Sequence, residues 1–144
     1  MAKDWIANWW KASEFDCLCC GLGGDLMDPI LIDILDKCRA EVGVQLQCSS
    51  GYRCPSHNSS PSVGSTSGSY HLKHQAADLT FGRRGLRTGT NVLRLFVILE
   101  RLGREHGGLG LGIYPTFIHC DTRSANDSGI KPARWSTFSW PRLK

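Results

Sequence analysis

The stretch "GSYHLKHQAADLTF", residues 68–81, joins a polar turn with two histidines to a short apolar strand that carries Asp78. Successive side chains of a strand point to opposite faces. Leu79 and Phe81 are therefore predicted to face the core, while Asp78 projects from the other face into a cleft lined by small residues. A bare carboxylate there is costly unless it is paired or bound to a cation. The strand thus predicts a polar or metal site beside the core.

Two histidines are the natural partners of Asp78. His71 comes from the turn just before the strand, and His119 lies in "FIHCD", where alternation predicts another strand. Two neutral imidazoles and one carboxylate form a common zinc ligand set that leaves a fourth position for water. On spacing alone, a surface histidine and a capping aspartate remain the simpler interpretation.

Regular elements are predicted on both sides of this stretch. In "MDPILIDILDKCRAEVG" Asp28 is placed to cap a helix, and apolar residues recur at helical spacing as far as Gly43. A second amphipathic helix is predicted at about 89–102. Period-two alternation predicts a strand in "VQLQCS" and a hairpin in "GLGLGIYPTFIHCDTR". Residues 3–11 are predicted to form a short helix with an aromatic face, and residues 55–69 a polar loop.

Length and composition limit the class of protein. A chain of 144 residues, 41% hydrophobic and 21% charged, fits one soluble domain over 1–144. We expect residues 1–26 to pack on a core of residues 27–135, with an irregular tail at 136–144. No apolar run is long enough to insert in a membrane, and the scattered basic residues behind the net charge of +4 give little support for nucleic-acid binding. A monomer is expected, made in the cytoplasm because no secretory signal is visible.

The cysteines allow two interpretations. Their number, seven, rules out complete intramolecular pairing, and the missing secretory signal favours reduced thiols. The alternative is a staple or a second, structural zinc ion held by members of the set Cys17, Cys19, Cys20, Cys48 and Cys54. Against it, the segments 17–20 and 48–54 do not show the two paired CxxC spacings of well-known structural zinc sites.

Four segments, "SGYRCPSHN", "SYHLKHQAADL", "GIYPTFIHCDTR" and "ARW", occur in an order that resembles the zinc D-Ala-D-Ala metallopeptidase family. The resemblance covers roughly residues 13–135. This family contains D-alanyl-D-alanine carboxypeptidases and dipeptidases, L-alanyl-D-glutamate endopeptidases and, as a structural cousin, the hedgehog signalling domain. It implies an α+β fold, with a small antiparallel sheet flanked by helices.

The resemblance also implies a ligand set and substrate contacts. Position by position, it assigns His71, Asp78 and His119 to one catalytic zinc ion. It places Ser69 in the first motif, as a residue that contacts the substrate. It assigns Arg53 to bind a carboxylate of the substrate. A guanidinium suits that role because it can donate two parallel hydrogen bonds to a carboxylate. His74 stands where the family usually has glycine, and we expect it at the rim of the substrate site.

The general base is where the chain departs from the family. Many members carry an acid three residues before the last histidine, but this chain has Thr116 there. Asp121 is the best substitute, since it faces the same way as His119, and an orienting role for Asp121 is the alternative. Tyr114 is a candidate donor to an oxyanion or, equally, a packed side chain. Cys120 is predicted to point away from the metal.

The function implied is hydrolysis of a peptide bond in the peptidoglycan stem peptide by a zinc metallopeptidase of the carboxypeptidase or endopeptidase type. A phage or prophage lytic enzyme that reaches the cell wall after release is the expected setting. The alternative is a non-catalytic binding or virion structural module of the same fold that keeps its zinc. Thr116 at the usual position of the base keeps this alternative open.

Overall fold

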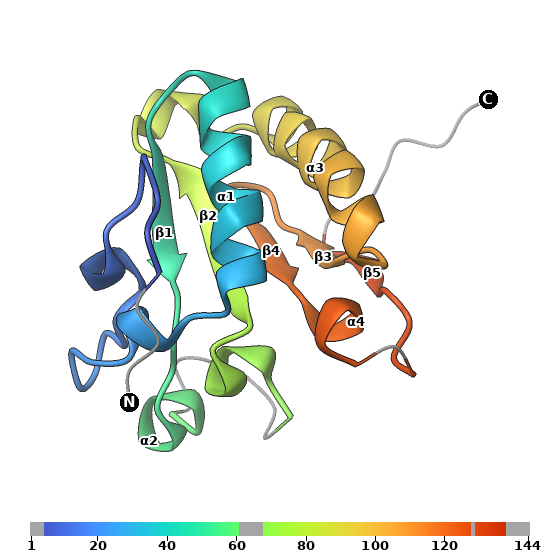
Figure 1. Ribbon diagram of the computed structural model, residues 1–144. Coiled ribbons are helices and arrows are strands. Elements are labelled where there is room, and N and C mark those ends of the chain that lie inside the picture. The colour runs from blue at the N-terminus through green and yellow to red at the C-terminus, as the bar shows by residue number, and fades with distance from the viewer. Residues whose placement is uncertain (1–4, 61–67, 128, 138–144) are drawn as a thin grey trace.

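A computed structural model describes residues 5–60, 68–127 and 129–137 of the chain. Its centre is a five-stranded sheet in the order β1-β2-β4-β3-β5. The strands are β1 (Leu46–Ser50), β2 (Ala76–Phe81), β3 (Gly110–Ile113), β4 (Ile118–Asp121) and β5 (Arg134–Ser136). Neighbouring strands run antiparallel except β3 and β5, which are parallel. The α+β fold expected from the sequence is confirmed (Figure 1).

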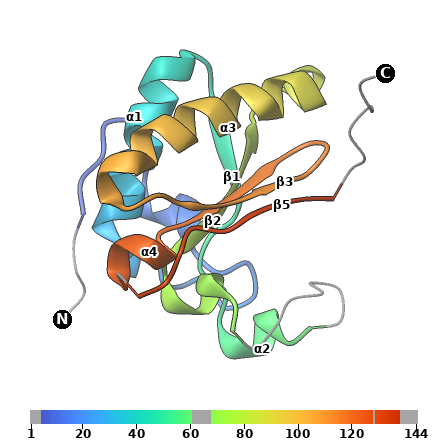
Figure 2. The ribbon, with the colours of Figure 1, turned by 90° about the vertical axis from the view of Figure 1, so that its right-hand side faces the viewer.

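Two long helices, α1 (Pro29–Val42) and α3 (Gly89–Gly103), lie together on one face of the sheet (Figure 2). The Asp28 side chain accepts a hydrogen bond from the backbone N–H of Ile30, and Pro29 occupies the first helical position, so α1 begins as predicted. It ends at Gly43, whose φ of 75° lies in the left-handed region that favours glycine. Both predicted amphipathic helices are confirmed.

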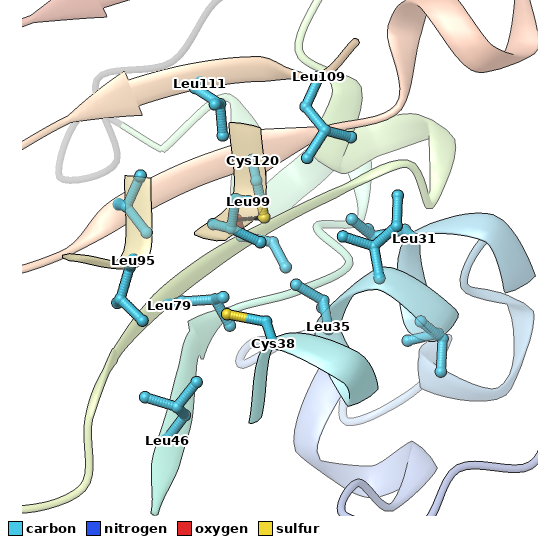
Figure 3. Close-up of a cluster of buried hydrophobic side chains, with 14 of the residues drawn as sticks. Leu31, Leu35, Cys38, Leu46, Leu79, Leu95, Leu99, Leu109, Leu111 and Cys120 are labelled. Atoms are coloured by element: carbon cyan, nitrogen blue, oxygen red, sulfur yellow. Dashed lines mark hydrogen bonds between the residues drawn. The ribbon is translucent and has the colours of Figure 1, made fainter. Parts of the chain in front are cut away.

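The hydrophobic core fills the space between these helices and the sheet (Figure 3). Leu79 of β2 and Cys120 of β4 point into it, as the alternation predicts. Apolar side chains from α1, α3, β3 and the residue before β3 complete it, among them Leu31, Leu35, Leu95, Leu99, Leu109 and Leu111. Burial of this one face fixes the register of β2 and β4, and therefore turns their polar side chains to the opposite face.

Short helical turns and loops lie at the end of the sheet that carries the polar residues. They are α2 (Pro55–Asn58), α4 (Arg123–Asn126) and the 3-10 turns η1 (Ala12–Phe15), η2 (Gly24–Leu26), η3 (Tyr70–Lys73) and η5 (Arg104–His106). A further 3-10 turn, η4 (Arg84–Leu86), follows the other end of β2. In Figure 2, α2 and η3 lie on the side of the sheet away from α1 and α3. None of the helices in the described part of the chain could cross a membrane.

Three predictions of local structure need correction. Within the described residues 5–11 there is no helix, because Trp5 and Trp10 instead pack their rings on Phe15 from an irregular segment. The C-terminal region is not wholly irregular, since β5 adds a strand to the sheet; residues 138–144 of the predicted tail lie outside the described residues. The predicted loop 55–69 contains α2, and its residues 61–67 lie outside the described residues.

Candidate metal centre

Two strands and one turn bring His71, Asp78 and His119 together. Asp78 of β2 and His119 of β4 are directly opposite each other in the antiparallel register, on the face turned away from the core. His71 belongs to η3, the turn that leads into β2, and its ring is buried. The structure brings these three predicted side chains together, since one ligand atom of each lies within 4.8 Å of the others.

The distances within this group fit a tetrahedral zinc ion. His71 Nε2 is 3.3 Å from His119 Nδ1 and 3.3 Å from Asp78 Oδ1, and His119 Nδ1 is 3.1 Å from Asp78 Oδ1. Ligand bonds of about 2.0–2.1 Å at tetrahedral angles place neighbouring ligand atoms ~3.3–3.4 Å apart. The three side chains therefore present three corners of a tetrahedron of nearly the size that zinc requires.

Hydrogen bonds fix which nitrogen of each imidazole faces the group. His71 Nδ1 is 2.7 Å from the Gly51 carbonyl oxygen, which can only accept, so Nδ1 carries the proton and Nε2 presents a lone pair. His119 Nε2 is 2.8 Å from Asp121 Oδ2 and donates to it, which leaves the lone pair of His119 on Nδ1. Such outer hydrogen bonds are what orient histidine ligands in metal sites. With both imidazoles neutral, three acceptor atoms thus face one another, and a metal ion, or a proton on one of the imidazoles, can bridge them.

Asp121 is fully buried, with 0% of its surface exposed. Oδ2 accepts from His119 Nε2 and from Arg123 Nη2 at 2.7 Å, and Oδ1 accepts from Arg123 Nε at 2.8 Å. Burial raises the pKa of Asp121, but the hydrogen bonds from Arg123 and His119 outweigh it and hold that pKa well below its usual range. These contacts favour the orienting role for Asp121 over the role of general base, because both oxygens are already engaged away from the metal group.

The electrostatic field at the group favours positive charge. Burial raises the pKa of Asp78, yet hydrogen bonds with His119 and His71 lower it far below its ordinary value, so the carboxylate is ionised. For His119 burial lowers the pKa, and the hydrogen bonds to Asp121 and Asp78 reverse this and raise it.

Arg53 adds a further contact, with Nη2 3.4 Å from Asp78 Oδ2 and Nε donating to Ser50 Oγ at 3.0 Å. The guanidinium thus borders the metal group.

Two glycines of β3 make room for this site. Gly110 is opposite Asp121, and a Cβ atom there would lie 2.4 Å from Asp121 Oδ2. Gly112 is opposite His119 and beside Trp135 of β5, and a Cβ atom there would lie 2.3 Å from the Trp135 ring. The alternating glycines of "GLGLG" therefore leave one face of β3 empty for the carboxylate and the indole. The Trp135 ring lies 5.1 Å from that of His119, centroid to centroid, and forms one wall of the site.

Ser69 and His74 have structural contacts in this fold. Ser69 Oγ accepts from the backbone N–H of His71 at 3.3 Å and so caps η3. His74 ends η3 with a φ of 61°, in the left-handed region that favours glycine. Its ring stacks on Tyr52 at a centroid distance of 4.0 Å, outside the metal group. These contacts shape the turn that carries His71.

Tyr114 and Thr116 lie in the turn between β3 and β4. The Tyr114 ring stacks on Phe117 at 4.2 Å, and its hydroxyl accepts from Trp135 Nε1 at 3.3 Å, so packing accounts for this side chain. The Thr116 carbonyl accepts from Thr80 Oγ1 at 2.6 Å, and its side chain is exposed. Sequence reasoning gave no role to Arg123 and Trp135, although both stand in the segments "CDTR" and "ARW" that carry the family resemblance.

A second group of metal-binding side chains lies apart from the first. The Sγ atoms of Cys17, Cys20 and Cys54 are all within 4.8 Å of one another. Cys48 is not a member, because it sits on β1 and packs against the core. Cys17 and Cys20 are themselves spaced as C-x-x-C within "CLCC", a signal that the sequence already carried. All seven cysteines are free thiols in this structure.

Comparison with known protein families matches most of the chain. The family model described as Peptidase M15 covers residues 11–121. This stretch includes the His71, Asp78 and His119 group and all three thiols of the cysteine group. No curated protein and no solved structure matches the chain.

Proposed function

The chain belongs to the peptidase M15 family, whose members are zinc-dependent peptidases, and from this premise we propose that it hydrolyses a peptide bond in the stem peptide of peptidoglycan. The observation that carries the proposal is the convergence of three lone pairs, from His71 Nε2, His119 Nδ1 and Asp78 Oδ1, at the separations of a zinc tetrahedron. Three protein ligands with one open position are the arrangement of catalytic zinc sites, whereas structural sites use four protein ligands.

Each residue of the site has a distinct task in this proposal. His71, Asp78 and His119 would hold the zinc ion. When bound, zinc supplies a Lewis acid for the scissile carbonyl and acidifies a water at neutral pH. Gly51 and Asp121 keep the two imidazoles in the tautomers that expose their lone pairs, and Arg123 keeps Asp121 ionised. The Asp121–Arg123 pair is thus a positioning pair.

Arg53 is proposed to bind a carboxylate of the substrate. Its side chain is 13% exposed and is held beside Asp78 by two polar contacts, so its position is fixed relative to the metal group. Stem peptides are rich in free carboxylates, and a guanidinium can accommodate one of them through paired hydrogen bonds. The Trp135 wall on the other side of His119 would limit the path of the peptide backbone.

The test is digestion of purified peptidoglycan with and without a chelator, followed by mass analysis of the products. New amino termini on D-glutamate would identify an L-alanyl-D-glutamate endopeptidase, and released D-alanine would identify a carboxypeptidase. Both products must disappear with the chelator and return when zinc is restored. Lysis of permeabilised bacteria by the added protein would test the phage or prophage type of role.

The alternative is a zinc-containing binding or virion structural module without catalysis. Two observations favour it: Thr116 occupies the position of the usual acid, and Asp121 is turned away from the metal group into its contact with Arg123. The same digestion separates the two functions. Zinc bound at the His71 group, with wall fragments retained by the protein but no new termini, would support the module and contradict the peptidase.

A further inference from the structure

Residues 17–21, "CLCCG", form a tight turn closed by backbone hydrogen bonds, called the knuckle below. The N–H of Gly21 donates to the Cys17 carbonyl at 2.8 Å, and the N–H of Cys17 donates to the Leu22 carbonyl at 2.9 Å. Gly21 has a φ of 70°, in the left-handed region, and no neighbouring atom lies near the position of an added Cβ. The turn places the side chains of Cys17 and Cys20, three residues apart, on the same side.

A third thiol comes from a distant part of the chain. The backbone N–H of Cys54 donates to Cys17 Sγ at 3.4 Å, and Cys54 Sγ joins the two thiols of the knuckle. Backbone N–H donors aimed at sulfur stabilise a thiolate, the form of cysteine that binds metals.

We propose that Cys17, Cys20 and Cys54 bind a second zinc ion, which is structural. Cys19 and His57 are the candidates for the fourth ligand. A C-x-x-C pair together with thiols from a second segment is a recurrent ligand set of structural zinc sites. Cys19 is the first candidate because it stands between Cys17 and Cys20 in the chain and is exposed, although its thiol lies outside the group of three. His57, three residues after Cys54, is the competing candidate for the fourth position. This site is independent of the hydrolase function, since it uses none of the residues that hold the first ion.

The second ion would also support the catalytic group through residues 51–54. Cys54 is fixed to the knuckle, Arg53 contacts Asp78, and the Gly51 carbonyl holds the tautomer of His71. Gly51 lies so close to the backbone of Phe15 that an added Cβ would be 2.5 Å from its carbonyl oxygen. The segments before Cys17 and before Cys54 are thus in direct backbone contact, and an ion between their thiols would fasten them at one end.

Cobalt substitution of the intact protein provides the first test. A thiolate site gives an intense sulfur-to-cobalt charge-transfer band in the near ultraviolet, which the two imidazoles and carboxylate of the first site cannot give. We expect this band in the wild-type chain loaded with cobalt, and we expect it to persist in His119→Ala. Absence of the band from folded, cobalt-loaded protein would overturn the proposal.

Zinc content per chain provides the second test. The wild type should bind about two zinc ions, and Cys54→Ser should bind about one. Cys38→Ala is the matched control, because Cys38 is a buried thiol of α1 outside the group, and it should keep about two. A wild type with about one zinc ion and a Cys17–Cys20 disulfide would overturn the zinc site in favour of a redox pair. Loss of the second ion in His57→Ala but not in Cys19→Ser would overturn Cys19 as the fourth ligand.

Discussion

The two candidate metal groups differ in what holds their side chains in place. Asp78 and His119 sit on neighbouring strands of a sheet whose other face is buried, and the second nitrogen of each imidazole is already hydrogen bonded. Cys17 and Cys20 belong to a turn and Cys54 caps α2, and the contact between Cys54 N–H and Cys17 Sγ links their two segments. The first group is held in place mainly by the sheet, whereas in the second the proposed ion would add a link between two loop segments that touch through a few backbone contacts. Removal of the metal should therefore have different consequences at the two sites.

The largest expected effect is the difference in hydrolysis rate between a variant of the first site and a variant of the second. His119→Ala should lower the rate of peptide hydrolysis at least about 10³-fold, because the metal contributes several kcal/mol of transition-state stabilisation. Cys54→Ser should keep a measurable rate, since the ligands of the first ion stay on the sheet. The measurement is release of fragments from purified peptidoglycan. His106→Ala, which removes a histidine of η5 outside both groups, is the control and should match the wild type. An equal loss of hydrolysis rate in Cys54→Ser and His119→Ala would contradict the difference between the two sites.

A smaller effect is expected from the residue that orients His119. Asp121→Asn should lower the affinity of the first site for zinc about 10–100-fold, because an amide holds the imidazole less strongly than a carboxylate paired with Arg123. Zinc affinity measured by chelator competition, with activity followed at saturating zinc, checks this.

Recovery of the rate at saturating zinc would support the orienting role of Asp121. A rate that stays low with the site fully loaded would instead restore Asp121 as the general base. Asp33→Asn is the matched control, since Asp33 forms an exposed i,i+4 pair with Lys37 on α1 and should change neither quantity.

Much of the first site was readable in the sequence, and little of the second. Period two in "AADLTF" and "FIHCD" gives the face of Asp78 and His119, because burial of Leu79 and Cys120 leaves no other orientation. Which residue of β4 lies opposite Asp78 depends on strand pairing, which local pattern does not encode. For the cysteines, the C-x-x-C spacing was visible, but the approach of Cys54 depends on the contact between residues 15 and 52.

Other features of the site also escaped local pattern. Asp121 faces the same way as His119, as predicted, but its pairing with Arg123 engages both oxygens of a carboxylate that was considered as the base. Strand β5 has only three residues, Arg134–Ser136, and an exposed, intermediate, exposed burial pattern, so its alternation is too short to detect. Its pairing with β3 places Trp135 beside Gly112, and the empty side of that glycine is what admits the indole.

The glycines of β3 offer a way to disturb the first site without touching a ligand. Gly110→Ala would place a Cβ 2.4 Å from Asp121 Oδ2, so the carboxylate must shift and the bond to His119 must lengthen. We expect a loss of about 1–3 kcal/mol in the free energy of unfolding and weaker zinc binding at the first site. Gly85→Ala, where no atom lies within 4 Å of the added Cβ, is the control. Denaturant unfolding of both variants checks this, and an unchanged Gly110→Ala would contradict the close packing of Asp121.

The smallest expected effect is a difference in alkylation between the buried core thiols and the exposed thiols of the second site. At neutral pH the core thiols should resist alkylation, since burial raises the pKa of Cys38 to about 12 and raises that of Cys120 well above its ordinary value. Cys19 and Cys20 are exposed, so only a bound ion would protect them. Mass mapping after brief alkylation should find them unmodified in zinc-loaded protein and modified once a chelator is added. Equal modification in both conditions would mean that no ion holds these thiols, and the proposed link between the two loop segments would disappear.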